Sequence, residues 1–146
     1  MKELDQNLEQ LDVIGENSER TVFKEIVLDL KEVQKVKEFD GAQSLYLFMH
    51  TDKEYPPLYR HAWGYAWVST RKDGRDIFPV SKLTFKLKMP VLSGKFMQDT
   101  EVINGKKKKA NVDCRFGGTI FGNFESYWFA EAEHPRYGKW HISNKW

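Results

Sequence analysis

The sequence predicts an α+β protein, with one or two N-terminal helices packed on a curved, mainly antiparallel meander sheet of about six strands. Apolar residues recur at helical spacing within residues 1–41, whereas residues 42–146 alternate apolar and polar side chains between turn signals. Elements that are segregated in this way along a chain are typical of α+β domains. A partly closed β-barrel is the alternative.

Composition indicates one globular domain over residues 1–146. The 146 residues, 40% of them hydrophobic and 30% charged, are enough to bury a core without disulfides or metal. The net charge of +2 does not indicate a nucleic-acid or membrane partner for the chain as a whole. The N-terminus lacks the apolar segment of a secretory signal, and the single cysteine, Cys114, cannot form an internal disulfide. We therefore expect a cytoplasmic protein that does not enter a membrane.

Two helices are expected in the N-terminal segment. Leucines at helical spacing predict a short helix over residues 3–13. A second predicted helix begins at the capping residues Asn17 and Ser18 and ends at Gly41. Its apolar stripe consists of Val22, Phe23, Ile26, Val27, Leu30 and Val33. Because Thr21–Leu30 is rich in β-branched residues, a strand is the competing interpretation there.

Residues 42–146 are expected to form the sheet. Ser44–Thr51 is apolar almost throughout, which indicates a central strand. Asn104-Gly105 is a strong signal for a tight turn between strands. The final pair of strands, Glu125–Glu133 and Lys139–Trp146, is joined by the turn sequence HPRYG.

The stretch Tyr59–Met89 is predicted to form the central hairpin of this sheet. Asp73-Gly74 lies between two alternating runs, and both residues tolerate the positive φ angles of a tight hairpin turn. With these two residues as the loop, Tyr65 would pair with Lys82. One face of the hairpin would then suit a core, since it would carry Ala62, Gly64, Ala66, Val68, Pro79, Ser81, Leu83 and Phe85.

The opposite face of the hairpin is the candidate binding surface. It would carry three aromatic residues and two lysines, namely Trp63, Tyr65, Trp67, Lys82 and Lys86. Bases of single-stranded nucleic acid stack on such surfaces, at roughly 1–3 kcal/mol per base, while lysines contact phosphates. A slip of one residue in the register, for which Pro79 offers a place, would bury the aromatic side chains instead.

Two basic clusters at predicted hairpin tips would extend this surface. They comprise Arg71, Lys72 and Arg75 beside the first turn, and Lys106, Lys107, Lys108 and Lys109 after the second. Each phosphate contact would add to a salt-dependent affinity for nucleic acid. Solubility alone also explains four adjacent lysines at a turn in water.

No motif commits the chain to a reaction. The four histidines lack metal-ligand spacing, and Cys114 has no partner cysteine. Arg115 could activate the Cys114 thiol, but a lone cysteine in a strand is more often a small core residue. Glu131 and Glu133 share one face of a strand, where exposure to water explains them as well as acid–base chemistry does. We therefore assign no catalytic residue, no metal site and no cofactor.

The sequence thus favours a non-enzymatic binding protein that holds a macromolecule on the aromatic and lysine face. Its partner would be single-stranded nucleic acid or an acidic protein surface, and its size fits an accessory factor or inhibitor from a phage or mobile element. The alternative is a small-ligand-binding or hydrolytic enzyme with a pocket inside a cone-shaped sheet. The polar groups of that pocket would come from His61, Asp113, His134 or His141. A homo-oligomer that uses the aromatic face as its contact is a third hypothesis.

Overall fold

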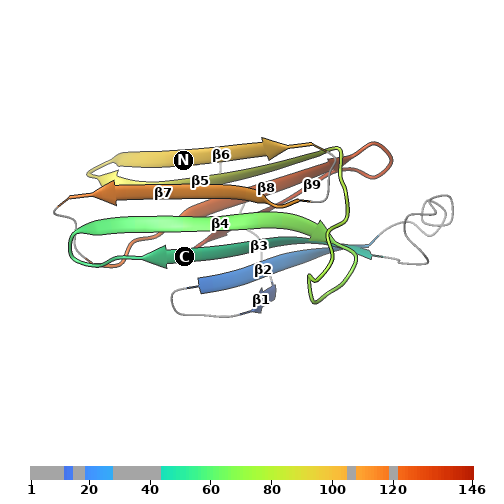
Figure 1. Cartoon of the computed structure of the whole chain (residues 1–146), viewed down its shortest axis with the longest axis horizontal. Helices are drawn as coiled ribbons and strands as arrows, with labels where there is room; N and C mark the ends of the chain where they lie inside the picture. The colour runs from blue at the N-terminus through green and yellow to red at the C-terminus, as the bar shows by residue number, and fades with distance from the viewer. Residues whose placement is uncertain (1–11, 15–18, 28–43, 105–107, 119–121) are drawn as a thin grey trace.

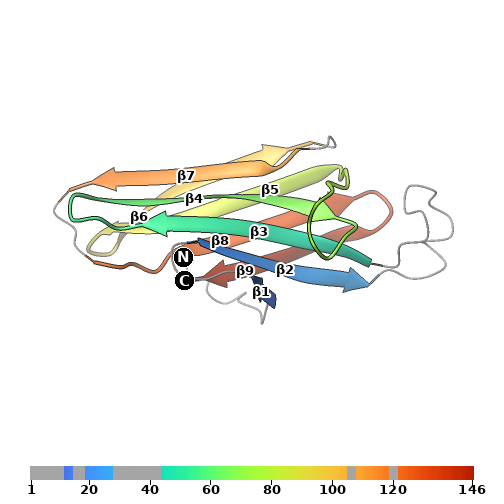
Figure 2. The ribbon, with the colours of Figure 1, turned by 60° about the horizontal axis from the view of Figure 1, so that its bottom comes forward.

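The computed structural model describes residues 12–14, 19–27, 44–104, 108–118 and 122–146, which form a β-sandwich (Figures 1 and 2). The described strands lie in two antiparallel sheets. Sheet A has the order β1-β2-β3-β4-β7 and consists of β1 (Asp12–Ile14), β2 (Glu19–Val27), β3 (Ser44–Glu54), β4 (Tyr59–Ser69) and β7 (Ala110–Gly117). Sheet B has the order β6-β5-β8-β9 and consists of β5 (Lys82–Leu92), β6 (Lys95–Ile103), β8 (Tyr127–His134) and β9 (Gly138–Lys145).

The inner faces of the two sheets enclose the main core. Trp128 of β8 is completely buried and its ring stacks on that of Phe85, with the centroids 5.8 Å apart. Gly64 of β4 makes room for this indole. A Cβ at Gly64 would lie 2.4 Å from the His50 carbonyl oxygen and 3.1 Å from the Trp128 ring, so no larger residue fits without a shift of the backbone.

Side chains join the two sheets at the corner between β6 and β7, each of which is the last strand of its sheet. The backbone N–H of Asp113 donates to Asp99 Oδ2 at 2.8 Å, and that of Asn111 donates to Glu101 Oε1 at 3.1 Å. The carboxylates of β6 therefore satisfy N–H groups that β7 presents away from its neighbour β4.

The predicted α+β class is wrong, because the described residues contain strands and no helix. Residues 19–27, assigned to the second helix, form β2 and pair with β3. Val22 is buried on the inner face of sheet A and Phe23 on the outer face. Because both faces of this strand carry apolar residues, its sequence lacks simple alternation and resembles the apolar spacing of a helix. The competing strand interpretation is confirmed over residues 21–27. Residues 12–13 of the first predicted helix belong to β1, and the rest of both helices lies outside the described residues.

The predicted central hairpin is also wrong. β4 pairs with β3 and β7, whereas β5 belongs to sheet B. Asp73-Gly74 does form a turn, in which Gly74 has a φ of 72° and its N–H donates to Arg71 O at 3.0 Å. This turn lies within residues 70–81, which cross from one sheet to the other. Two separate sheets also replace both the meander and the partly closed barrel.

Three other predictions about the sheet are confirmed. All pairing between described strands is antiparallel, and Ser44–Thr51 lies within β3, between β2 and β4. The final hairpin exists as β8 and β9. Within the described part of the chain, no helix has the length and apolar character needed to cross a membrane.

Candidate functional site

The candidate site is the outer face of sheet A, where β4 contributes every second side chain. The inward residues are those predicted from their size, Ala62, Gly64, Ala66 and Val68. The outward residues are His61, Trp63, Tyr65 and Trp67. The alternation along β4 is therefore confirmed, and this face divides into an apolar end around Trp67 and a polar end around Trp63.

The apolar end is covered and offers no stacking platform. The ring of Trp67 stacks on Phe48 at 4.9 Å with an interplanar angle of 9°, and Phe48 in turn contacts Phe23 at 5.0 Å. The loop of residues 70–77 follows the end of β4 (Figure 2). It covers these rings, since Gly74 lies against the Phe48 and Trp67 side chains, Ile77 packs on the same cluster, and the Trp67 indole N–H donates to Gly74 O at 2.9 Å. Trp67 is only 6% exposed, so its ring is covered in this structure, and its stacking on a ligand stays a prediction.

Hydrogen bonds to Asp76 hold this covering loop to the end of β4. The carboxylate accepts from the Ser69 hydroxyl, from the Thr70 hydroxyl at 2.6 Å and from the Thr70 backbone N–H at 3.2 Å. Burial raises the pKa of Asp76, but these hydrogen bonds outweigh it and keep the pKa below its ordinary value. The charged carboxylate therefore stabilises the closed loop.

The predicted lysines of β5 lie on the other side of the molecule. Lys82 forms an ion pair with Glu133 of β8 at 3.7 Å, and Lys86 Nζ lies 5.6 Å from the centroid of the Phe129 ring. Both therefore project from the outer face of sheet B. The expected combination of Trp63, Tyr65 and Trp67 with Lys82 and Lys86 does not exist.

The remaining predicted cations are distributed around the apolar end. Arg71 forms two hydrogen bonds with Asp73, Arg75 lies 3.9 Å from the same carboxylate, and Lys72 is exposed. Lys109 reaches the aromatic face, with Nζ 4.1 Å from the Trp67 ring and 4.5 Å from the Tyr65 ring. Lys108 is exposed, and Lys106 and Lys107 lie outside the described residues.

The polar end is built from cross-strand neighbours on β3, β4 and β7. Trp63 lies between Asp52 and Asp113, and the partly exposed indole is thus flanked by carboxylates from both neighbouring strands. The next row places His61 between Glu54 and Arg115. Three carboxylates therefore gather around Trp63 and His61, and a second imidazole, that of His50, lies 3.3 Å from Asp52 Oδ2.

His61 connects two of these carboxylates. Its Nδ1 lies 3.2 Å from Glu54 Oε1 and its Nε2 lies 3.0 Å from Asp113 Oδ2, while its ring centroid is 4.3 Å from that of Trp63. An ionised carboxylate has about four lone-pair sites on its two oxygens. A contact with the imidazole therefore leaves each of the two carboxylates able to accept from a donor brought by a ligand.

Tyr59 borders the same group. Its hydroxyl donates to Glu54 Oε1 at 3.1 Å, and this hydrogen bond is the main cause that raises the pKa of Tyr59 above its ordinary value. The guanidinium of Arg115 lies 4.3 Å from the Tyr59 ring. The polar end thus presents a neutral phenol and one cation beside three acids.

Cys114 adds no nucleophile to this site. Cys114 is buried on the inner face, and burial, followed by the nearby charges of Asp99 and Asp113, raises the pKa of its thiol to about 12. The thiol is therefore inert, and the interpretation of Cys114 as a small core residue is confirmed. Among the described residues, no group of three or more His, Cys, Asp or Glu side chains is arranged to hold a metal ion.

Sequence reasoning missed Asp52 and Glu54, because the predicted strand Ser44–Thr51 ends just before them. β3 in fact continues to Glu54. The available signal was the alternation Asp52-Lys53-Glu54, which extends the period of the preceding strand. His61 and Asp113, predicted as polar groups of an enclosed pocket, instead come together on the outer face.

Comparison with protein-family models, with curated proteins and with solved structures shows no match to the chain. Any conclusion about function therefore depends on the chemistry of the residues described above.

Proposed function

We propose that this chain is a non-enzymatic binding protein that holds a basic segment of a partner protein on the polar end of sheet A. The observation that supports this proposal is the position of Trp63 between Asp52 and Asp113. A lysine or arginine side chain over the indole would gain a cation–π interaction and lie beside two carboxylates. Tryptophan, tyrosine and arginine are also the residues most enriched among interface hot spots.

The local charge favours this partner over those expected from the sequence. Asp52, Glu54 and Asp113 outnumber Arg115 around Trp63, so phosphates or an acidic protein surface would be repelled at this end. Single-stranded nucleic acid remains a prediction, but it lacks the expected contacts to Lys82 and Lys86, and Trp67 is covered by the loop of residues 70–77.

The test is a titration with a fluorescein-labelled peptide rich in lysine and arginine, followed by fluorescence anisotropy at two salt concentrations. The wild-type protein should bind, and added salt should weaken binding because the contacts are charged and exposed. Trp63→Ala and Asp113→Asn should each weaken binding by about tenfold or more. Glu131→Gln, which removes a carboxylate from the outer face of sheet B, is the matched control and should leave binding unchanged.

A labelled single-stranded oligonucleotide provides the opposing measurement. Tight binding of the oligonucleotide that Trp63→Ala abolishes, with no binding of the basic peptide, would overturn the proposal in favour of nucleic acid. Trp63→Ala should retain a melting temperature close to that of the wild type, because its indole is partly exposed.

A further inference from the structure

Three cations lie on the inner face of sheet A at one end of the sandwich. Arg20 of β2, Lys53 of β3 and Arg60 of β4 share the inward alternation of their strands. Lys53 is the most deeply placed, with 4% of its surface exposed. A buried ammonium needs compensation, because leaving water costs several kcal/mol per ion.

Aromatic rings and two backbone carbonyls provide the compensation that the structure describes, and one of these carbonyls is Pro90 O, which accepts from Arg60 Nη1 at 3.0 Å. Lys53 Nζ donates to Phe124 O at 2.8 Å and lies 4.6 Å from the centroid of the Trp146 ring. The Arg20 guanidinium lies 4.8 Å from the same Trp146 ring, and that of Arg60 lies 5.1 Å from the Phe124 ring. The three cations thus surround two aromatic side chains.

Among the described residues, no carboxylate forms an ion pair with any of these cations. The Nε atoms of Arg20 and Arg60 are buried and make no hydrogen bond. An ammonium has three donors, and only one N–H of Lys53 is used by Phe124 O. The cluster therefore has unused donors, and the nearby charge of Glu125 offsets the positive charge of Lys53 only in part.

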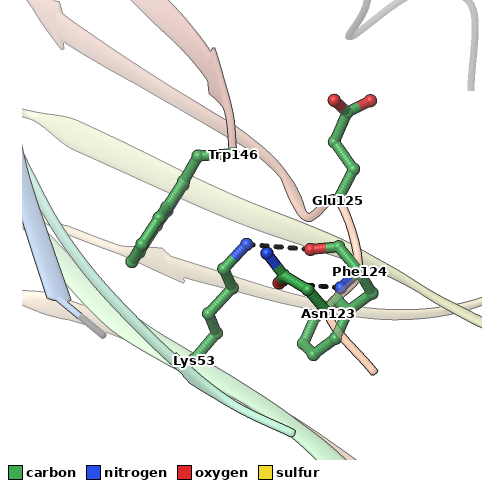
Figure 3. A pocket seen from close by; sticks show the side chains of 5 residues that line it. All are labelled: Lys53, Asn123, Phe124, Glu125 and Trp146. Carbon is green, nitrogen blue, oxygen red and sulfur yellow. Dashed lines mark hydrogen bonds between the residues drawn. The ribbon is translucent and has the colours of Figure 1, made fainter. Parts of the chain in front are cut away.

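A pocket of about 240 Å³ opens beside Lys53 and is lined by Lys53, Asn123, Phe124, Glu125 and Trp146 (Figure 3). The Trp146 indole N–H donates to Thr51 Oγ1 at 2.8 Å, which fixes the ring beside the lysine. Figure 3 shows the Glu125 carboxylate directed away from Lys53. Glu125 instead accepts from the Tyr127 hydroxyl at 3.0 Å and lies 3.9 Å from Lys145 Nζ.

We propose that this pocket binds a small ligand with one carboxylate on an apolar body, the carboxylate at Lys53 and the body against Trp146 and Phe124. The site is separate from the polar end of sheet A, because Lys53 points to the inner face and Trp63 to the outer. Glu125 at the rim favours a single negative charge over a phosphate dianion. The volume lies just below the roughly 300–1,000 Å³ of drug-sized pockets, so the ligand must be small.

The electrostatics of Lys53 agree with such a ligand. Burial, followed by the nearby charge of Arg20, lowers the pKa of Lys53 to about 8. A carboxylate beside the ammonium would favour its charged form and raise this pKa again. Binding of the carboxylate would thus offset part of the free-energy cost of burying the charged ammonium.

Isothermal titration calorimetry with phenylacetate at pH 7 tests the proposal. Wild-type protein should bind phenylacetate, whereas phenylacetamide, which has the same shape without charge, should bind about tenfold more weakly or not at all. Lys53→Met should lose the preference for the acid, and Lys95→Met, at an exposed position of β6, should keep it. Equal binding of acid and amide, or a preference that survives Lys53→Met, would overturn the proposal.

A second measurement, the dependence of phenylacetate binding on pH, needs only the wild-type protein. Between pH 7 and about pH 9.5 Lys53 loses its proton while Arg20 and Glu125 keep their charges, so phenylacetate should bind progressively more weakly. Binding that does not change over this range would contradict the proposal.

A third measurement separates two sources of the carboxylate, a small acid and the C-terminus of a peptide. A short peptide ending in phenylalanine, compared with its C-terminal amide, shows whether a peptide terminus binds more tightly than the small acid. Either order supports the carboxylate site and identifies its better ligand.

Discussion

The two faces of sheet A at the end of β3 carry opposite charge, although the residues that supply it are adjacent in the sequence. Asp52 and Glu54 point outward toward Trp63 and His61, whereas Lys53 between them points into the space between the sheets. Glu54 stays exposed to water and Asp52 lies 3.3 Å from His50, whereas the inward cation is held by Trp146 and Phe124. Side chains that alternate across a strand have thus separated a tripeptide of two acids and one base into an acidic surface and a cationic interior.

This difference shows that overall charge is a poor guide to the partners of a sheet. A net charge of +2 hides an acidic outer end and a cationic inner end within one strand. The same contrast applies to the tryptophans, since Trp128 on the inner side is completely buried and Trp63 on the outer side is partly exposed. Three measurements test this difference between the inner and the outer side of the sheet.

The largest effect is expected when the inner tryptophan is truncated. Trp128→Ala removes a fully buried indole that packs on Phe85 and donates to Ser126 Oγ at 2.8 Å. We expect a loss of about 3–5 kcal/mol in the free energy of unfolding, measured by urea denaturation. Trp63→Ala, on the outer face, should cost less than half as much. Equal losses would mean that the two faces are buried to a similar degree.

The next effect concerns the dependence of stability on pH. Lys53 has a pKa of about 8 in the folded chain and an ordinary value of 10.5 when unfolded. Between these values the unfolded chain binds more protons than the folded chain, so the free energy of unfolding should rise with pH. The stability of the wild type minus that of Lys53→Met should therefore increase by about 2–3 kcal/mol from pH 8 to pH 10.5.

The subtraction removes the contribution of every other titrating group, because both proteins share them. A difference that stays constant over this range would show that Lys53 is well solvated, and the inner face would no longer contrast with the outer.

The smallest effect tests whether the apolar end of the outer face behaves as a second core. Trp67→Phe keeps a ring on Phe48 but removes the hydrogen bond to Gly74 O, so we expect a loss of about 1 kcal/mol. Amide hydrogen exchange should become faster across residues 70–77, which this bond holds against the sheet. Trp63→Phe is the control and should change neither quantity. Unchanged exchange in Trp67→Phe would mean that Asp76 alone holds the loop.

Local patterns within residues 42–146 predicted strands and their faces, but not their partners, whereas β1 and β2 were taken for helices. The small inward residues of β4 and the buried Leu83 and Phe85 of β5 follow from alternation, which each strand carries by itself. Pairing depends on residues far apart in the chain. Asp73-Gly74 specifies a turn, but that turn forms within a connection between sheets, and no local signal distinguishes this connection from a hairpin.

Only part of the candidate site was predicted, and the reason is the same. Trp63 and Tyr65 were placed on one face correctly, because both belong to one strand. Their neighbours Asp52, Glu54 and Asp113 come from β3 and β7. The alternation of side chains along one strand cannot reveal which strands lie beside it in the sheet. Lys82 and Lys86 were wrongly joined to this face once β5 was taken as the partner of β4.

The carboxylates that bridge β6 and β7 have a consequence for association between molecules. An unoccupied strand edge offers its N–H groups to the carbonyls of another chain, which is how sheets extend into fibres. At Asn111 and Asp113 those N–H groups are already taken by Glu101 and Asp99 of the same molecule. These two acidic side chains thus leave an incoming strand no free N–H to pair with at these positions, and a chain that lost them would present these N–H groups to other strands.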